Sequence, residues 1–124
     1  VGLKLKRAER MEMAGVRVER GDVADPGTLQ RLFDRYGFTH VIHLAAQAGV
    51  QYSLRDPLSY VEANVRGFVV LLETLKTRPS VVLTYASSSS VYGTNTKVPF
   101  SEEDPIDNTA SMYAATKAAD EAIA

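Results

Sequence analysis

Two stretches in the second half of the chain carry side chains that could move a proton. Four serines, Ser87 to Ser90, lead into Val-Tyr-Gly93, and Tyr113 is followed four residues later by Lys117. Residues four apart in a helix lie on one face, so the phenol and the ammonium would be neighbours. A phenol with a pKa near 10 is a poor base at neutral pH, but a nearby ammonium favours the phenolate. The pair is a candidate general base with its activating cation.

A tyrosine and a lysine at this spacing are a weak signal on their own, because a surface helix presents the same pair without chemistry. The serine run adds weight because it directly follows an apolar run over 81–86 that we interpret as a buried strand. In open parallel sheets, ligands bind beyond the carboxyl ends of the strands. We therefore place the candidate site between the end of this strand and the start of the helix that carries Tyr113.

The elements that position this site alternate short apolar runs with longer helical ones, which is typical of an α/β fold with a parallel sheet. Helices are expected over 3–14, 25–36, 56–78 and 111–124, and strands over 16–19, 40–45 and 81–86. A polar loop of roughly twenty residues separates the last strand from the last helix, and loops of that length tend to be functional.

The helix expected over 56–78 has one apolar stripe. Its members are Val61, Val65, Phe68, Leu72 and Leu75. Val69 and Leu71 lie off this stripe, and surplus apolar surface indicates a partner. Two alternatives remain for what buries this surface: a second copy of the chain in a homodimer, or another part of the same domain.

Composition excludes several function classes. A net charge of −1 gives no electrostatic reason to expect nucleic acid as a partner. The chain has no cysteine, so disulfides and cysteine-ligated metals are excluded. His40 and His43 lack a third ligand at a suitable spacing, so no metal site is expected. The acidic run from Ser101 to Pro105 is interpreted as a solvated turn.

The motifs Ala86-Ser-Ser-Ser-Ser-Val-Tyr-Gly93 and Tyr113-x-x-x-Lys117 together resemble the extended short-chain dehydrogenase/reductases, in the NAD-dependent epimerase/dehydratase family. The runs His43-Leu-Ala-Ala-Gln-Ala-Gly-Val50 and Ser101-Glu-Glu-Asp104 look most like the UDP-glucuronate 4-epimerases within it. The resemblance implies NAD as cofactor, a UDP-sugar as substrate, and epimerisation at C4 through a 4-keto sugar. A UDP-glucose 4-epimerase, a sugar-nucleotide reductase and a non-catalytic remnant of an NAD-binding fold remain alternatives.

The resemblance also implies a role for each matching residue. Tyr113 would be the catalytic base, Lys117 would bind the nicotinamide ribose, and Ser88 would assist at the sugar. Ser89 and Ser90 would hold a glucuronate carboxylate, unless the serines merely cap the strand end. Cofactor contacts are implied for Asp22, Val23, Leu44, Ala45, Ala46, Gln47, Asn64 and Ala86 as well as for Tyr113 and Lys117. Asp22 could instead form a turn after Gly21, and Asn64 could lie on the exposed side of its helix.

The fold that the resemblance implies is a partial Rossmann-type, doubly wound parallel sheet over residues 1–124 that lacks its first two strands. The glycine-rich turn and the C-terminal substrate domain of the family are not found in this sequence, so we expect the chain alone to bind NAD weakly or not at all. In the strand order 3-2-1-4-5-6, the runs 40–45 and 81–86 should pair in parallel, and 16–19 should stand apart or pair non-natively because its partner is absent.

Three further expectations come from the resemblance. Gln51 stands where these epimerases usually have arginine, which puts in doubt whatever that arginine contributes to anion binding. A homodimer is expected for the complete protein. Its location would be the cytoplasm for a bacterial protein, or the Golgi membrane for a plant-type protein whose anchor lies outside this sequence.

Overall fold

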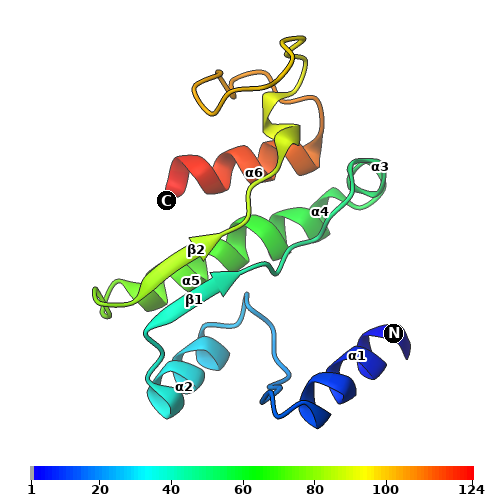
Figure 1. Cartoon of the computed structure of the whole chain (residues 1–124). Helices are drawn as coiled ribbons and strands as arrows, with labels where there is room; N and C mark the ends of the chain where they lie inside the picture. The colour runs from blue at the N-terminus through cyan, green and yellow to red at the C-terminus, as the bar shows by residue number, and fades with distance from the viewer. Residues whose placement is uncertain (1) are drawn as a thin grey trace.

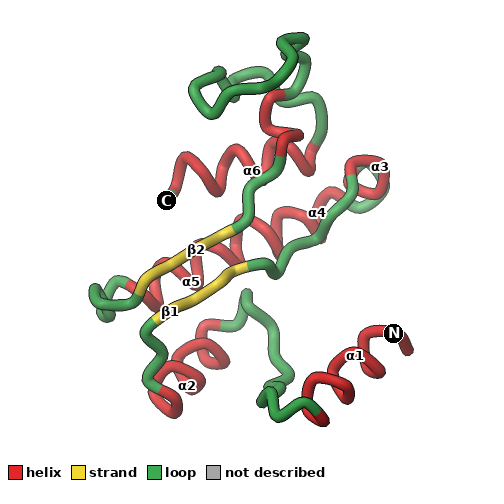
Figure 2. The backbone as a smooth tube through the Cα atoms, viewed as in Figure 1, coloured by secondary structure: helices red, strands yellow, loops and turns green. Residues whose placement is uncertain are grey.

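A computed structural model describes residues 2–124 and centres on two parallel strands, β1 (His40–His43) and β2 (Val82–Tyr85). Their register runs from His40 opposite Val82 to His43 opposite Tyr85. Figure 2 shows the two strands side by side, and the Ala86 amide continues the ladder by donating to the His43 carbonyl at 3.2 Å. The predicted parallel pairing is confirmed, although both strands are shorter than expected.

Helix α2 (Pro26–Tyr36) begins and ends where the sequence predicts. The Asp25 carboxylate accepts from the backbone amides of Gly27 and Thr28, and its bond from the Thr28 hydroxyl is the main reason that its pKa is lowered. Gly37, at φ +59°, adopts the left-handed conformation that ends the helix. Capping is a local interaction, which is why the sequence alone located both ends.

The predicted long helix consists of three continuous segments, α4 (Pro57–Tyr60), the π-helical η1 (Val61–Arg66) and α5 (Gly67–Leu75). Its buried face includes polar Asn64 and Thr74 together with Phe68 and Leu71. The expectation that Leu71 lies off the buried stripe is therefore wrong, since Leu71 is only 3% exposed and forms the core with Leu29 and Phe33 of α2. The pattern of apolar residues predicted the wrong buried face, because hydrogen-bonded polar residues such as Asn64 and Thr74 are buried on this helix as well.

The segment over 16–19 is not a strand, so that expectation is wrong. No strand lies beside it among the described residues, and it contacts helix α2 through side chains. The Arg17 guanidinium lies 4.9 Å from the Tyr36 ring centroid, and the Tyr36 hydroxyl donates to Glu19. Its predicted separation from the sheet is confirmed. The preceding helix α1 (Gly2–Met13) has no buried residue and lies to one side in Figure 1.

The long loop after β2 is organised rather than open. It begins with the short 3-10 helix η2 (Ser89–Tyr92) and leads to helix α6 (Met112–Ile123), which Ser111 caps. The Asp104 carboxylate connects parts of the loop, because it accepts hydrogen bonds from Lys97 Nζ at 2.6 Å and from the Ser101 amide at 2.8 Å. These bonds, led by the one from Lys97, lower the pKa of Asp104. A short helix that the sequence did not predict, α3 (Val50–Ser53), precedes α4.

Helices cover only one face of the strand pair. Val41 packs against the core residues of α2 and α5 and His43 stacks on Phe68 of α5, whereas Ile42, Leu44 and Val82 on the other face are 70%, 71% and 52% exposed. Parallel sheets are normally covered on both faces, so this is an open apolar surface. Over residues 2–124, no helix is both long and apolar enough to cross a membrane.

Two glycines with positive φ offer a matched test of the loop. A Cβ at Gly93 (φ +54°) would meet the Asn108 carbonyl oxygen at 1.8 Å, whereas a Cβ at Gly37 would meet nothing within 4 Å. We expect Gly37→Ala to lower the free energy of unfolding by about 1–2 kcal/mol through backbone strain alone. Gly93→Ala should lower it by more than about 3 kcal/mol, because backbone must also move. Chemical unfolding of the two variants measures this, and equal losses would contradict it.

Candidate active site

Tyr113 lies in the first turn of α6 with its side chain half-buried. Its ring meets the ring of Tyr60 edge-on, with the centroids 6.2 Å apart. Tyr60 is fully buried, and its hydroxyl donates to the carbonyls of Ala48 and Gly49 at 2.9 and 2.7 Å. Burial raises the pKa of Tyr60, so this phenol stays protonated and serves as a wall. Of the two rings, only Tyr113 is exposed enough to meet a substrate.

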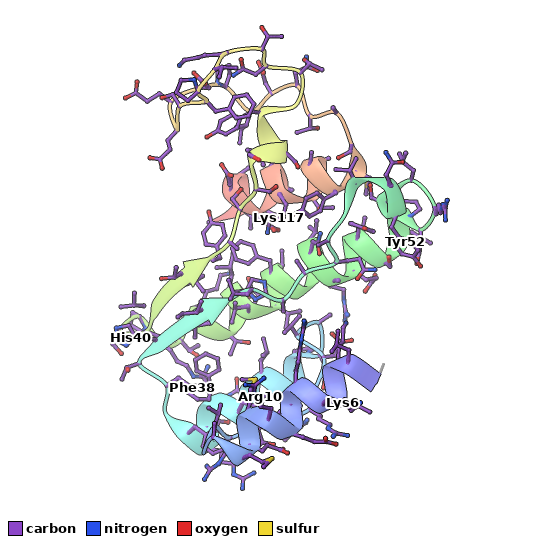
Figure 3. All side chains as sticks on the ribbon, turned by 45° about the vertical axis from the view of Figure 1, so that its right-hand side comes forward. Lys6, Arg10, Phe38, His40, Tyr52 and Lys117 are labelled. Carbon is purple, nitrogen blue, oxygen red and sulfur yellow. The ribbon has the colours of Figure 1, made fainter. Side chains whose placement is uncertain are left out.

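Lys117 lies one turn beyond Tyr113, and its ammonium is paired with Asp120 on the same helix. Lys117 Nζ is 2.6 Å from Asp120 Oδ2, and the two side chains are 5% and 1% exposed. Figure 3 shows Lys117 on the side of α6 that faces the long helix. Asp120 was not among the predicted site residues, although an acid three residues after the lysine was a visible signal.

His43, at the end of β1, adds a third titratable group to this cluster. It is 7% exposed, and its ring stacks on Phe68 at 5.6 Å. Burial is the main cause that lowers the pKa of His43; the Lys117 charge acts in the same direction and Asp120 in the opposite one. Burial raises the pKa of Asp120, and the bond from Lys117 opposes this effect. The cluster therefore consists of one neutral imidazole and one ion pair at neutral pH.

Asn64 joins the loop after β1 to helix α6. Its Oδ1 accepts from the Gln47 amide at 2.7 Å, and its Nδ2 donates to the Gln47 carbonyl at 3.1 Å and to the Thr116 hydroxyl at 2.9 Å. The Thr116 hydroxyl donates in turn to the Tyr113 carbonyl at 2.8 Å. Asn64 is 1% exposed, so the alternative of a polar residue on the exposed side of its helix is wrong. It fixes the distance between the loop at Gln47 and the Tyr113 turn.

The serine run lies in and before η2, which packs against α6. The Ser88 hydroxyl accepts from the Ser90 amide at 3.2 Å and so caps η2, while the Ser87 hydroxyl donates to Glu121. Ser88 and Ser89 line a surface hollow with Tyr92, Glu102 and Glu121 among others. Capping therefore occurs, as the simpler interpretation held, and the proton-transfer and carboxylate roles remain predictions.

Several of the predicted cofactor residues meet at the free edge of β1. Val23, Leu44 and Ala45 line one hollow there, and Val23 also packs against Gly67 of α5. The Asp22 carboxylate accepts from the Ala24 amide at 2.9 Å. This bond belongs to a turn after Gly21, which is what the alternative interpretation of Asp22 predicted. Ala46 and Ala86 are exposed, and Gln51 lies exposed in α3. Within residues 2–124, no group of three metal-ligating side chains comes together.

A family profile described as GDP-mannose 4,6 dehydratase matches residues 3–124. UDP-glucuronate 4-epimerase 3 of Arabidopsis thaliana is 55% identical over 123 residues, which are 98% of this chain and 29% of the relative. UDP-glucuronate 4-epimerase 5 of the same plant is 56% identical, with 98% of this chain and 28% of the relative covered. The chain thus spans less than a third of the length of these two relatives.

Solved structures show the same arrangement. UDP-glucose 4-epimerase from Bifidobacterium longum, in complex with NAD+ and UDP, superposes with a TM-score of 0.84 at 33% identity, covering 94% of this chain and 36% of that one. UDP-glucose 4-epimerase from Thermus thermophilus, in complex with NAD, gives 0.80 at 37% identity, covering 88% and 35%. The fold is of the extended short-chain dehydrogenase/reductase class. Within it, the chain belongs to the GDP-mannose 4,6 dehydratase family.

The buried His43 predicts a pH dependence of stability. Its folded pKa lies below the ordinary 6.5, so the unfolded chain takes up a proton first as the pH falls. Stability should therefore fall as the pH is lowered through 6.5, and His43→Phe should remove this loss. The raised pKa of Asp120 acts oppositely at lower pH. Thermal melts between about pH 7.5 and 5.5 measure the effect. Exposed His40 is the control, and a loss that His40→Gln removes instead would contradict the assignment.

Proposed function

We propose that this chain supplies the Tyr-Lys helix and part of the cofactor site of an NAD-dependent 4-epimerase acting on a UDP-sugar. The observation that carries the proposal is the Asn64 bridge, which joins Gln47 in the loop after β1 to Thr116 and the Tyr113 carbonyl on the helix that also bears Lys117. The names of the relatives support UDP-glucuronate as the sugar and UDP-galacturonate as its product. UDP-glucose 4-epimerase is the second candidate, favoured by the solved structures.

The described residues suit a dinucleotide. Ala45 and Ala46 are small and exposed directly after β1, where a flat cofactor must approach the backbone closely. An ammonium has three donors, and Asp120 accepts from one of them, so Lys117 can also reach ribose hydroxyls. When bound, NAD would accept hydride from the sugar C4 and return it. Leu44, Ala45, Ala46, Gln47 and Lys117 would hold it, with Asp22 and Val23 at the adenine end.

The protein's part in the reaction is placement and proton transfer. Tyr113, as the phenolate that the positive charge of Lys117 would stabilise, would take the proton from the C4 hydroxyl while hydride leaves C4 and the 4-keto group forms. Ser88 would donate a hydrogen bond at the same hydroxyl. The 4-keto sugar would turn over, and Tyr113 would return the proton when hydride comes back to the other face.

The complete protein is proposed to be a homodimer through α5 and α6. Val69 of α5 and Ile123 of α6 are exposed and line one surface hollow, with Leu72 and Leu75 beside them. Exposed apolar side chains on two adjacent helices are the surface that a second copy would bury.

Removing the phenol oxygen tests the catalytic role. In the natural protein that contains this chain, Tyr113→Phe should lower turnover about 10²–10⁴-fold, because the general base is lost while the ring remains. NAD binding should persist. Tyr52→Phe is the matched control, since Tyr52 also packs against Tyr60 but is 48% exposed. Steady-state kinetics decide, and undiminished turnover by the Tyr113 variant would overturn the proposal.

Substrate choice tests the serine run. A carboxylate at position 90 would repel a glucuronate carboxylate, whereas hydroxyls donate to it at about 1.5–3 kcal/mol each. Ser90→Glu should therefore depress turnover of UDP-glucuronate far more than turnover of UDP-glucose. Ser87→Glu, in which the altered residue faces Glu121, is the control for added charge nearby. Equal losses on both sugars would favour the second candidate function.

A further inference from the structure

A buried carboxylate lies beneath the candidate catalytic pair. Asp120 is on the same face of α6 as Tyr113 and Lys117, at helical steps of four and three, and it is 1% exposed. Its Oδ2 accepts from Lys117 Nζ at 2.6 Å. Its Oδ1 is also buried and has no hydrogen-bond partner among the described residues. An acid in such a place is costly unless it is paired, so Lys117 is the reason that it can remain charged.

The remaining titratable neighbour does not compete for this acid. His43 approaches from β1, and because burial lowers the pKa of His43 it is neutral at neutral pH. Among the described residues, Lys117 is the cation that donates to Asp120, and His43 has the smaller influence on the pKa of this carboxyl. The reverse also holds, since the flexible four-carbon stem of a lysine has no fixed direction until its ammonium is bonded. The Asp120 carboxylate provides that bond.

Stability alone is a weak reason for the pair. Buried ion pairs often contribute no more to folding than apolar residues of similar volume, because both charges must be desolvated. What the pair does determine is where the ammonium lies, one turn from Tyr113 and with two donors still to use. The Asp120 charge also offsets part of the Lys117 charge. Cofactor binding and the basicity of the candidate base would both depend on the position and the net charge of the Lys117 ammonium.

We propose that Asp120 is a positioning residue for Lys117, holding the ammonium where it can bond both the carboxylate and the hydroxyls of a nicotinamide ribose. Only one part of this inference, that Lys117 bonds the ribose hydroxyls (the ribose clause), rests on the proposed function. The pairing itself is a property of the chain, and the two parts can be tested separately.

The pairing is tested by the reactivity of the Lys117 amine in the natural protein that contains this chain. Lys117 is buried, so in the wild type it should react with an amine-specific ester more slowly than Lys97, whose side chain is 54% exposed. Asp120→Asn should free the ammonium and raise the labelling of Lys117 relative to Lys97, read by peptide mass mapping. Glu121→Gln, one residue further and bonded to Ser87 instead, should change nothing. Unchanged labelling in the Asp120 variant would overturn the pairing.

The ribose clause is tested by NAD affinity in a double-mutant cycle. Asp120→Asn should weaken NAD binding about tenfold or more, the value of a hydrogen bond from a charged group, with UDP binding unchanged. In a Lys117→Met background the same substitution should have no further effect, because the lysine it positions is gone. A merely structural acid would give additive losses and shift UDP binding as well, which would overturn the proposal.

The failures of the two proposals are distinguishable. If the wild-type protein binds no NAD, the proposed function and the ribose clause both fall, while the labelling experiment still decides the pairing. If Asp120→Asn unfolds the protein, Asp120→Glu keeps the charge and should restore protection of Lys117 and most of the NAD affinity. Failure of Asp120→Glu to restore either, in a protein that melts as the wild type does, would contradict positioning by the carboxylate.

Discussion

The hydrogen bonds of Asn64 connect the parts of the chain that the candidate site requires. This one amide bonds the backbone N–H and C=O of Gln47 and, 52 positions further along the chain from Asn64, the hydroxyl of Thr116, so it links the loop after β1 to helix α6. Buried amide groups that are fully bonded have few alternative geometries, since any shift leaves a donor or acceptor unpaired at a cost of about 1–3 kcal/mol. The position of Tyr113 relative to β1 is therefore set by polar contacts more than by apolar packing.

The π-helical segment that carries Asn64 belongs to the same constraint. A π turn inserts an additional residue into a helix, and such turns occur frequently at functional sites. Here the turn lies between Tyr60, whose hydroxyl bonds the carbonyls of Ala48 and Gly49, and Phe68, which packs against His43 and Tyr85. One helix thus supplies the Tyr60 ring that packs against Tyr113, the Asn64 bridge, and the Phe68 ring that packs against His43 of β1 and Tyr85 of β2. A regular α-helix would rotate one of these three away from its partners.

The lower part of the site depends on charge rather than shape. Lys117 and Asp120 are both nearly inaccessible, so each is tolerated only because the other is present. His43 remains neutral beside them, and apolar Phe68 excludes water from its other side. The cation that the proposed chemistry uses is consequently held by groups that never meet the substrate. Lys97 is also bonded to a carboxylate, Asp104, but its side chain is 54% exposed, so it meets solvent where Lys117 does not.

The sequence by itself determined the features that local interactions decide. Asp25, Pro26 and Gly37 bounded α2 correctly because capping involves atoms only a few residues apart. The Tyr113 and Lys117 spacing was likewise readable, and the parallel pairing of the two apolar runs, which is not local, followed from the strand order that the family resemblance implies. Only the tertiary structure decided that Asn64 and Asp120 are buried, that Leu71 belongs to the core, and that 16–19 forms no strand. The burial of Asn64, Asp120 and Leu71 depends on elements that are distant in sequence, and 16–19 forms no strand because no partner strand lies beside it. The periodicity of apolar residues carries no information about such partners.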